Sequence, residues 1–199
     1  MHKIYITEGI VLGKRGAGEA NSSVSLLTAE LGLVRASARS ARYEKSKLRY
    51  GLEPLTRGRF SLVRGKYEWK LTGVVEPQRL FSNSLVPMEG KQAVGRVTRL
   101  MLRLIQGEEP VPVLYKTVSE GFEFLVDAQN MRDAQAIECV LVLRILAHLG
   151  YLPERPELAP FVATSSADEL FSLELTAQAA RSRTLLIKAI NESLTATGL

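Results

Sequence analysis

The spacing of the apolar residues changes once along this chain of 199 residues, between residues 81 and 90. Before that point apolar and polar residues alternate: Val34 and Ala36 share one parity, and Arg35 has the other. After it, apolar residues recur every three or four positions. A period of two is typical of strands, whereas a period near 3.6 is typical of helices. We therefore expect a two-domain α+β chain, with a β half followed by an all-α half.

The alternation in the β half predicts five short strands, at residues 4–12, 24–28, 33–40, 55–64 and 67–75. Four apolar residues of the first strand share one parity: Ile4, Ile6, Ile10 and Leu12. A tight turn is expected at Gly65-Lys66, between the last two strands. No long helix separates these strands, which favours a small, closed or nearly closed barrel. Five strands with a strongly cationic surface indicate an OB-fold.

The second half predicts four helices from four apolar stripes, at residues 94–105, 114–125, 133–149 and 173–194. The third is apolar almost all round, which is typical of a helix buried at the centre of a bundle. Gly150 is expected to end it.

The expected boundaries follow from these patterns: an OB-fold over residues 1–80, a linker over 81–90 and a helical domain over 91–199. Three prolines predict irregular structure within residues 151–167. No apolar stretch approaches the ~18–20 residues that span a bilayer, and the N-terminus lacks a signal-peptide core. We expect a cytoplasmic protein without a membrane partner.

The charge is divided between the two halves. The formal net charge is +5, yet residues 1–80 hold 15 Lys or Arg against 7 Asp or Glu, and the remainder is acidic. The basic residues of the first half are spread over several strands instead of one tail. Such an imbalance favours a polyanion-binding half over basic surface that merely aids solubility.

Few residues could carry covalent chemistry or hold a metal. Cys139 is the sole cysteine, so an internal disulfide and a multi-cysteine zinc site are excluded, and its apolar surroundings predict a buried thiol. His148 is expected to be a helix-end residue favoured by the macrodipole. Residues 13–18 are glycine-rich, but they lack the ending of a P-loop, so we expect a flexible loop between strands. These observations weigh against an enzyme, and we expect no cofactor.

Several short motifs occur in a distinctive order. They are Glu8–Leu12, Leu26–Gly32, Ala38–Arg42, Lys45–Arg49, Leu52–Leu55, Leu62–Gly65 and Gly150–Pro153. In this order and spacing they resemble the bacterial RecO family of DNA repair and recombination proteins.

The resemblance implies an N-terminal OB-fold, a C-terminal helical domain and a recombination mediator. Such a protein binds single- and double-stranded DNA, anneals complementary strands and works with RecR. It also contacts the acidic tail of the single-strand-binding protein and helps RecA to displace that protein. Many relatives carry a four-cysteine zinc cluster after the Gly-Tyr-Leu-Pro segment, whereas Glu154–Pro160 here contain no cysteine. We therefore expect no zinc. A nucleoid-associated location in the cytoplasm follows from this role.

The DNA-binding candidates are basic residues of the first half: Lys14, Arg15, Arg35, Arg39, Arg42, Lys45, Lys47, Arg49, Arg57, Arg59, Arg64 and Lys66. We expect outward-facing arginines to neutralise phosphates along the barrel, and residues 42–49 to form a mobile cationic loop. Tyr67 and Trp69 are candidates for base stacking, but they share the parity of Leu71 and Val75, which favours a core position.

The candidate site for the tail is a helix face with Arg96, Arg99 and Arg103 at spacings of three and four. A solvated helix face is the competing interpretation. For the whole protein, the alternative is a generic OB-fold that binds single-stranded nucleic acid without mediator activity.

Overall fold

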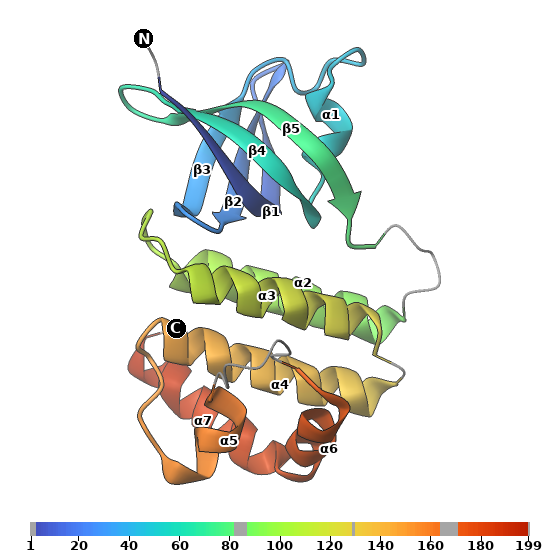
Figure 1. The fold of residues 1–199 in the computed structure, drawn as a ribbon, viewed down its shortest axis with the longest axis vertical. Helices are drawn as coiled ribbons and strands as arrows, with labels where there is room; N and C mark the ends of the chain where they lie inside the picture. The colour runs from blue at the N-terminus through green and yellow to red at the C-terminus, as the bar shows by residue number, and fades with distance from the viewer. Residues whose placement is uncertain (1–2, 82–86, 129, 164–170, 199) are drawn as a thin grey trace. The chain divides into compact units, whose positions relative to one another are not determined.

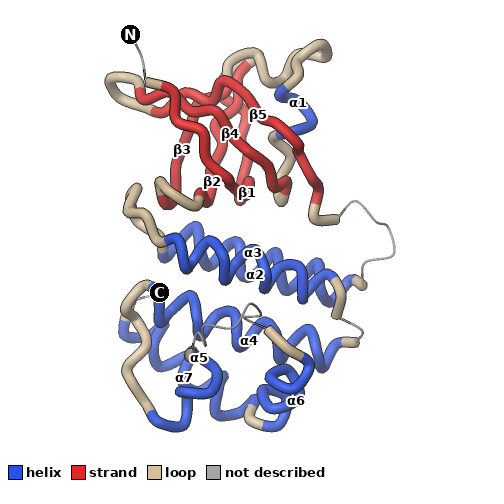
Figure 2. The backbone as a smooth tube through the Cα atoms, viewed as in Figure 1, coloured by secondary structure: helices blue, strands red, loops and turns tan. Residues whose placement is uncertain are grey.

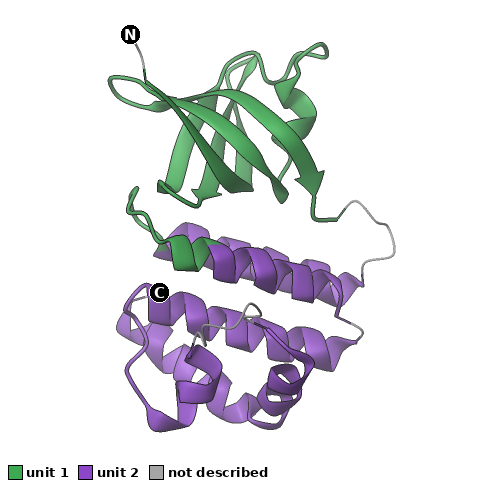
Figure 3. Cartoon of the chain, viewed as in Figure 1, with its two compact units in different colours: residues 1–82, 105–115 green, residues 83–104, 116–199 purple. Residues whose placement is uncertain are grey.

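The computed structural model describes residues 3–81, 87–128, 130–163 and 171–198, which belong to two units (Figure 1, Figure 3). Unit 1 consists of Met1–Ser82 and Ile105–Tyr115, and unit 2 of Asn83–Leu104 and Lys116–Leu199. The segment Ile105–Tyr115 contacts the barrel at two points. Glu108 pairs with Arg64, and a Cβ added to Gly32 would collide with the backbone carbonyl of Glu109.

Unit 1 is a closed five-stranded barrel in the order β1-β2-β3-β5-β4 (Figure 2). Its elements are β1 (Ile4–Ala17), β2 (Asn21–Thr28), β3 (Gly32–Ala38), α1 (Leu48–Gly51), β4 (Thr56–Arg64) and β5 (Trp69–Arg79). β3 and β5 pair in parallel, while the other neighbours, including β1 with β4, are antiparallel. This order confirms the predicted OB-fold.

The barrel interior follows the predicted alternation on β3 and β4. Val34, Ala36 and Ala38 are buried while Arg35 and Arg39 are exposed, and Phe60 is fully buried on β4. On β1 the predicted apolar face is buried only in part, because Ile10 and Leu12 are each 3% exposed whereas Ile4 and Ile6 are 61% and 68% exposed. Val11, of the opposite parity, belongs to the barrel core.

β5 also departs from simple alternation. The strand begins at Trp69, so Tyr67 lies in the preceding turn and is 86% exposed, which corrects its predicted core position. Ser61 pairs with Gly73 and Leu62 with Leu71, which leaves Thr72 as an extra residue. This bulge inverts the parity, so Val74 packs against the core and Val75 is exposed. Trp69 is 5% exposed, which confirms its predicted core position.

Unit 2 is helical. Its elements are α2 (Met88–Leu104), α3 (Pro112–Val126, which starts in unit 1), α4 (Met131–His148), the 3-10 turn η1 (Pro156–Leu158), α5 (Ala159–Val162), α6 (Leu173–Arg181) and α7 (Arg183–Ala196). α4 packs against α2, α5, α6 and α7, which confirms its central position. None of the helices in the described ranges is long and apolar enough to cross a bilayer.

Three helix predictions need correction. α2 already begins at Met88, inside the expected linker. The expected helix at 173–194 is two helices, because Ser182 interrupts it. Residues 156–162 form short helical turns instead of irregular chain, whereas 164–167 lie outside the described residues.

α4 contains a buried cation. Arg144 is 3% exposed, its Nε donates to the Phe161 carbonyl at 2.8 Å, and its guanidinium lies 4.9 Å from the centre of the Phe171 ring. These contacts attach α5 and Phe171, two residues before α6, to the central helix. One turn later, His148 Nε2 lies 3.1 Å from the Thr117 hydroxyl. Burial and the nearby Arg144 lower the pKa of His148, so the neutral ring is favoured, and the expected macrodipole contact does not explain this residue.

Candidate nucleic-acid interface

The outer face of β1, β2, β3 and β5 carries a continuous row of four hydrophilic residues. Backbone pairing places Arg15 opposite Ser23, Ser23 opposite Ser37, and Ser37 opposite Lys70. The row therefore has two serines at its centre and a cation at each end. Strands β2 and β3 of an OB-fold are the usual platform for oligonucleotides.

A second row runs beside the first. Gly13 pairs with Ser25, and Ser25 pairs with Arg35. Arg39, one residue past the end of β3, is exposed. Every position of the two rows is a cation, a serine or a glycine, which suits contact with phosphates better than base stacking.

The turn between β4 and β5 adds an aromatic residue and a carboxylate at the edge of this face. In Gly65–Glu68 the ammonium of Lys66 lies 5.0 Å from the centre of the Tyr67 ring, and Tyr67 is available for stacking. Glu68 opposes the cations, because its Oε1 accepts a hydrogen bond from the Ser37 hydroxyl at 3.0 Å. The predicted tight turn is therefore a four-residue turn, closed by Gly65 N–H donating to the Glu68 carbonyl.

The glycine-rich stretch at 13–18 is not a loop along most of its length. Gly13 to Ala17 belong to β1 and pair with β2, and the turn comprises only residues 18–20. The turn between β1 and β2 is held to the segment that follows β3, because an Arg42 nitrogen donates to the Gly18 carbonyl at 2.8 Å. Residues 42–49 likewise form a series of turns that leads into α1, with Ser46 N–H donating to the Tyr43 carbonyl. Lys45 and Lys47 are exposed there.

Three predicted residues lie on another part of the barrel. Arg57, Arg59 and Arg64 belong to β4, and β5 separates β4 from β3, so they do not share a face with Arg35 and Arg39. Arg59 pairs with Glu76 at 3.2 Å. Arg64 pairs with Glu108 and lies 4.9 Å from the centre of the Trp69 ring. A phosphate would have to compete with these carboxylates.

The predicted arginines of unit 2 divide in the same way. Arg96 forms a bidentate pair with Glu138, at 2.7 and 2.6 Å, which raises its pKa. Arg99 and Arg103 are exposed on the same helix and have no partner among the described residues. Two of the three predicted cations are therefore available on α2.

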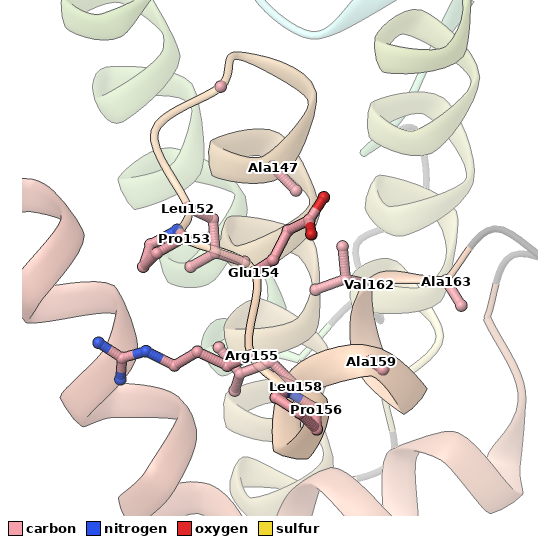
Figure 4. A pocket seen from close by; sticks show the side chains of 11 residues that line it. Ala147, Leu152, Pro153, Glu154, Arg155, Pro156, Leu158, Ala159, Val162 and Ala163 are labelled. Atoms are coloured by element: carbon pink, nitrogen blue, oxygen red, sulfur yellow. The ribbon is translucent and has the colours of Figure 1, made fainter.

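Unit 2 also contains a pocket of about 770 Å³ (Figure 4). Its apolar lining includes Leu152, Leu158 and Val162, and its cation is Arg155, which pairs with Glu192 at 2.7 Å. The α2 arginines are not among the described residues that line it. The described lining of this pocket therefore neither includes nor replaces the predicted face of Arg99 and Arg103.

Metal-binding and thiol chemistry have little support in the described ranges. No cluster of three or more His, Cys, Asp or Glu side chains there is arranged to hold a metal ion. Burial, as the largest cause, raises the pKa of the Cys139 thiol to about 11, so the nucleophilic thiolate is scarce at neutral pH.

Four residues of the two rows are not among the predicted DNA-binding residues: Lys70, Ser23, Ser25 and Ser37. Alternation around Trp69 signals that Lys70 points outward. Its position beside β3 depends on a pairing between strands far apart in the chain.

Comparisons with known proteins agree with this fold. The family model described as "Recombination protein O N terminal" matches residues 1–76, and "Recombination protein O C terminal" matches residues 93–155. Together these ranges cover more than half of the chain.

Curated relatives carry the name "DNA repair protein RecO". Those from Desulfitobacterium hafniense, Heliobacterium modesticaldum and Dehalococcoides mccartyi are 26%, 29% and 31% identical over 156, 152 and 155 residues. The alignments cover 78%, 76% and 78% of this chain, and 55%, 54% and 60% of the respective relatives. The chain thus spans little more than half the length of these relatives. With both family models matched in order, the chain belongs to the RecO family of DNA repair proteins.

Proposed function

We propose that this chain is a non-catalytic recombination mediator that binds single- and double-stranded DNA and anneals complementary strands. The observation that carries the proposal is the row Arg15–Ser23–Ser37–Lys70 on the OB-fold face. Cations and hydroxyls bind phosphate oxygens, which are present in every DNA sequence. Such a surface binds strands without selecting a sequence.

Annealing follows from the same composition. Where the platform offers serine and arginine instead of aromatic rings, affinity comes from the sugar–phosphate backbone and bases stay free to pair. The cations reduce the repulsion between two complementary strands, and the protein does not have to release any base before the strands pair. A generic single-strand binder, by contrast, stacks the bases of the bound strand on its aromatic side chains and so inhibits their pairing with a second strand.

The partners are proposed from the family: RecR, the tail of the single-strand-binding protein and, indirectly, RecA. Arg99 and Arg103 are available cations for the acidic tail. The substrate implies a cytoplasmic protein associated with the nucleoid.

An annealing assay tests this function. Complementary labelled oligonucleotides, bare or coated with single-strand-binding protein, are mixed with the wild-type protein and with the double variant Arg35→Ala/Arg39→Ala. Arg99→Ala/Arg103→Ala is the matched control, because it removes the same charge from unit 2. We expect the first variant to anneal bare strands slowly and the control to anneal them like the wild type. A wild-type protein that binds strands but leaves them unpaired would instead be the generic single-strand binder.

A further inference from the structure

The inward-facing positions of the barrel change from apolar to polar at one end. Val24 belongs to the barrel core, but the next inward residue of β2 is Ser22. Opposite them on β1 are Lys14, paired with Val24, and Gly16, paired with Ser22. Lys14, Gly16 and Ser22 line a hollow of about 600 Å³ together with residues from the 41–54 segment.

Three cations meet one carboxylate in this hollow. Lys14, Arg42 and Arg49 line it, and so does Glu53. Lys14 Nζ lies 3.0 Å from Glu53 Oε1, and the Lys14 side chain is only 18% exposed. Arg42 lies close to the β1 backbone, where a Cβ added to Gly16 would stand 3.4 Å from its guanidinium. The balance of charge therefore favours a further anion.

Ser22 supplies an independent observation. Ser22 is 0% exposed, and its Oγ has no hydrogen-bond partner in the described part of the chain. A buried hydroxyl is normally paired, since an unpaired one costs free energy. A hydroxyl lining a cationic hollow is a suitable donor to an anionic oxygen.

We propose that this hollow is a phosphate site, and that Glu53 occupies it in the free protein in place of a phosphate. Ammonium, guanidinium and hydroxyl donors are the groups that bind phosphate oxygens. A phosphate that enters must separate Glu53 from Lys14, so the carboxylate lowers the affinity. This inference rests on the proposed DNA binding, and it adds a site at the barrel end, apart from the outer rows.

The first test is the variant Glu53→Gln, which removes the competing charge and keeps the size of the side chain. Glu44→Gln is the matched control, because Glu44 is exposed in the same basic segment and has no partner among the described residues. We expect Glu53→Gln to bind an oligonucleotide up to about fivefold more tightly than Glu44→Gln does. Equal affinities of the two variants would overturn the role of Glu53.

The second test removes the buried hydroxyl. Ser22→Ala loses no hydrogen bond within the described chain, so its melting temperature should match the wild type. Its affinity for phosphate should nevertheless fall. Wild-type affinity in a folded Ser22→Ala protein would contradict the site.

Inorganic pyrophosphate separates this inference from DNA binding as a whole. Titrated into wild-type protein, it should shift the backbone amide signals of residues 14–22 and 42–53. Those shifts without any DNA binding would support the hollow and refute the proposed function. DNA binding with no pyrophosphate shift there would refute the hollow alone.

Oligonucleotides with a 5′-phosphate or a 5′-hydroxyl then identify the source of the phosphate. Tighter binding of the phosphorylated strand, lost in Ser22→Ala, assigns a strand end to the site. Equal binding of both strands, weakened in Ser22→Ala, assigns an internal phosphate.

Discussion

Ser37 on β3 lies directly opposite Lys70 on β5, in the parallel pairing of the barrel. Because β5 enters the sheet beside β3, Lys70 extends the outer face that Arg15, Ser23 and Ser37 begin. The pairing therefore adds Lys70 of β5 to the row formed by β1, β2 and β3, and the four strands share one cationic surface.

We expect Lys70→Ala to weaken single-stranded DNA binding irrespective of sequence, because a phosphate contact is lost. The slope of log K against log salt concentration should fall by about 0.7. Fluorescence anisotropy at several salt concentrations measures both quantities, with Lys188→Ala of unit 2 as the charge-matched control. An unchanged slope would remove Lys70 from the interface.

Trp69 is the sole tryptophan, and its indole is buried in the barrel core. Its ring forms an edge contact with Tyr5, with 5.1 Å between centroids, and its Nε1 has no hydrogen-bond partner within the described residues. We expect Trp69→Phe to keep full DNA affinity and to lose only packing, at about 1–3 kcal/mol of stability. Wild-type emission should be blue-shifted, poorly quenched by acrylamide and unaltered by DNA. Strong quenching on DNA binding would show that Trp69 stacks on bases after all.

Stability should depend on pH through His148. Burial, and then Arg144, lower its pKa below the ordinary 6.5, so the folded protein keeps the ring neutral where the unfolded chain protonates it. The free energy of unfolding therefore falls as the pH drops below about 6.5, and levels off at the folded-state pKa. Urea unfolding is measured from ~pH 5 to ~pH 7.5, a range that brackets the ordinary histidine pKa. The wild type should lose stability toward the acidic end, and His148→Gln should lose less. Identical pH profiles would mean that another group titrates.

Charge reversal at Arg99 and Arg103 tests the proposed contact with the tail of the single-strand-binding protein. We expect Arg99→Glu/Arg103→Glu to lose binding of a labelled acidic tail peptide while affinity for naked DNA stays at the wild-type level. The reason is that both cations are exposed and have no partner among the described residues. Unchanged peptide binding would eliminate the α2 face, and the pocket lined by Leu152, Leu158 and Arg155 would be tested next.

The fold could be predicted from the sequence wherever one period runs without interruption. The alternation of residues 33–40 and the apolar character of α4 are such cases. Prediction failed where local geometry resets the parity: the extra residue Thr72 turns Val75 outward. Ser182 likewise divides a stripe that reads as one continuous helix.

The interface was harder to predict than the fold, because charge is visible in sequence and pairing is not. Arg35 and Arg59 both alternate with apolar residues in the sequence and so look equivalent. In the barrel, however, β5 separates their strands, and Arg59 is paired with Glu76. The contact of Lys14 with Glu53 joins residues 39 positions apart. No local pattern indicates it.

The most direct test of the central claim compares an oligonucleotide with an abasic strand of the same length and charge. If the serine and arginine face holds the backbone and leaves bases free, the two strands should bind within about twofold of each other. Affinity for both should fall together in Arg35→Ala/Arg39→Ala and stay unchanged in Arg99→Ala/Arg103→Ala. Binding that collapses on the abasic strand would contradict the account, because base stacking, at about 1–3 kcal/mol per base, would then carry the affinity.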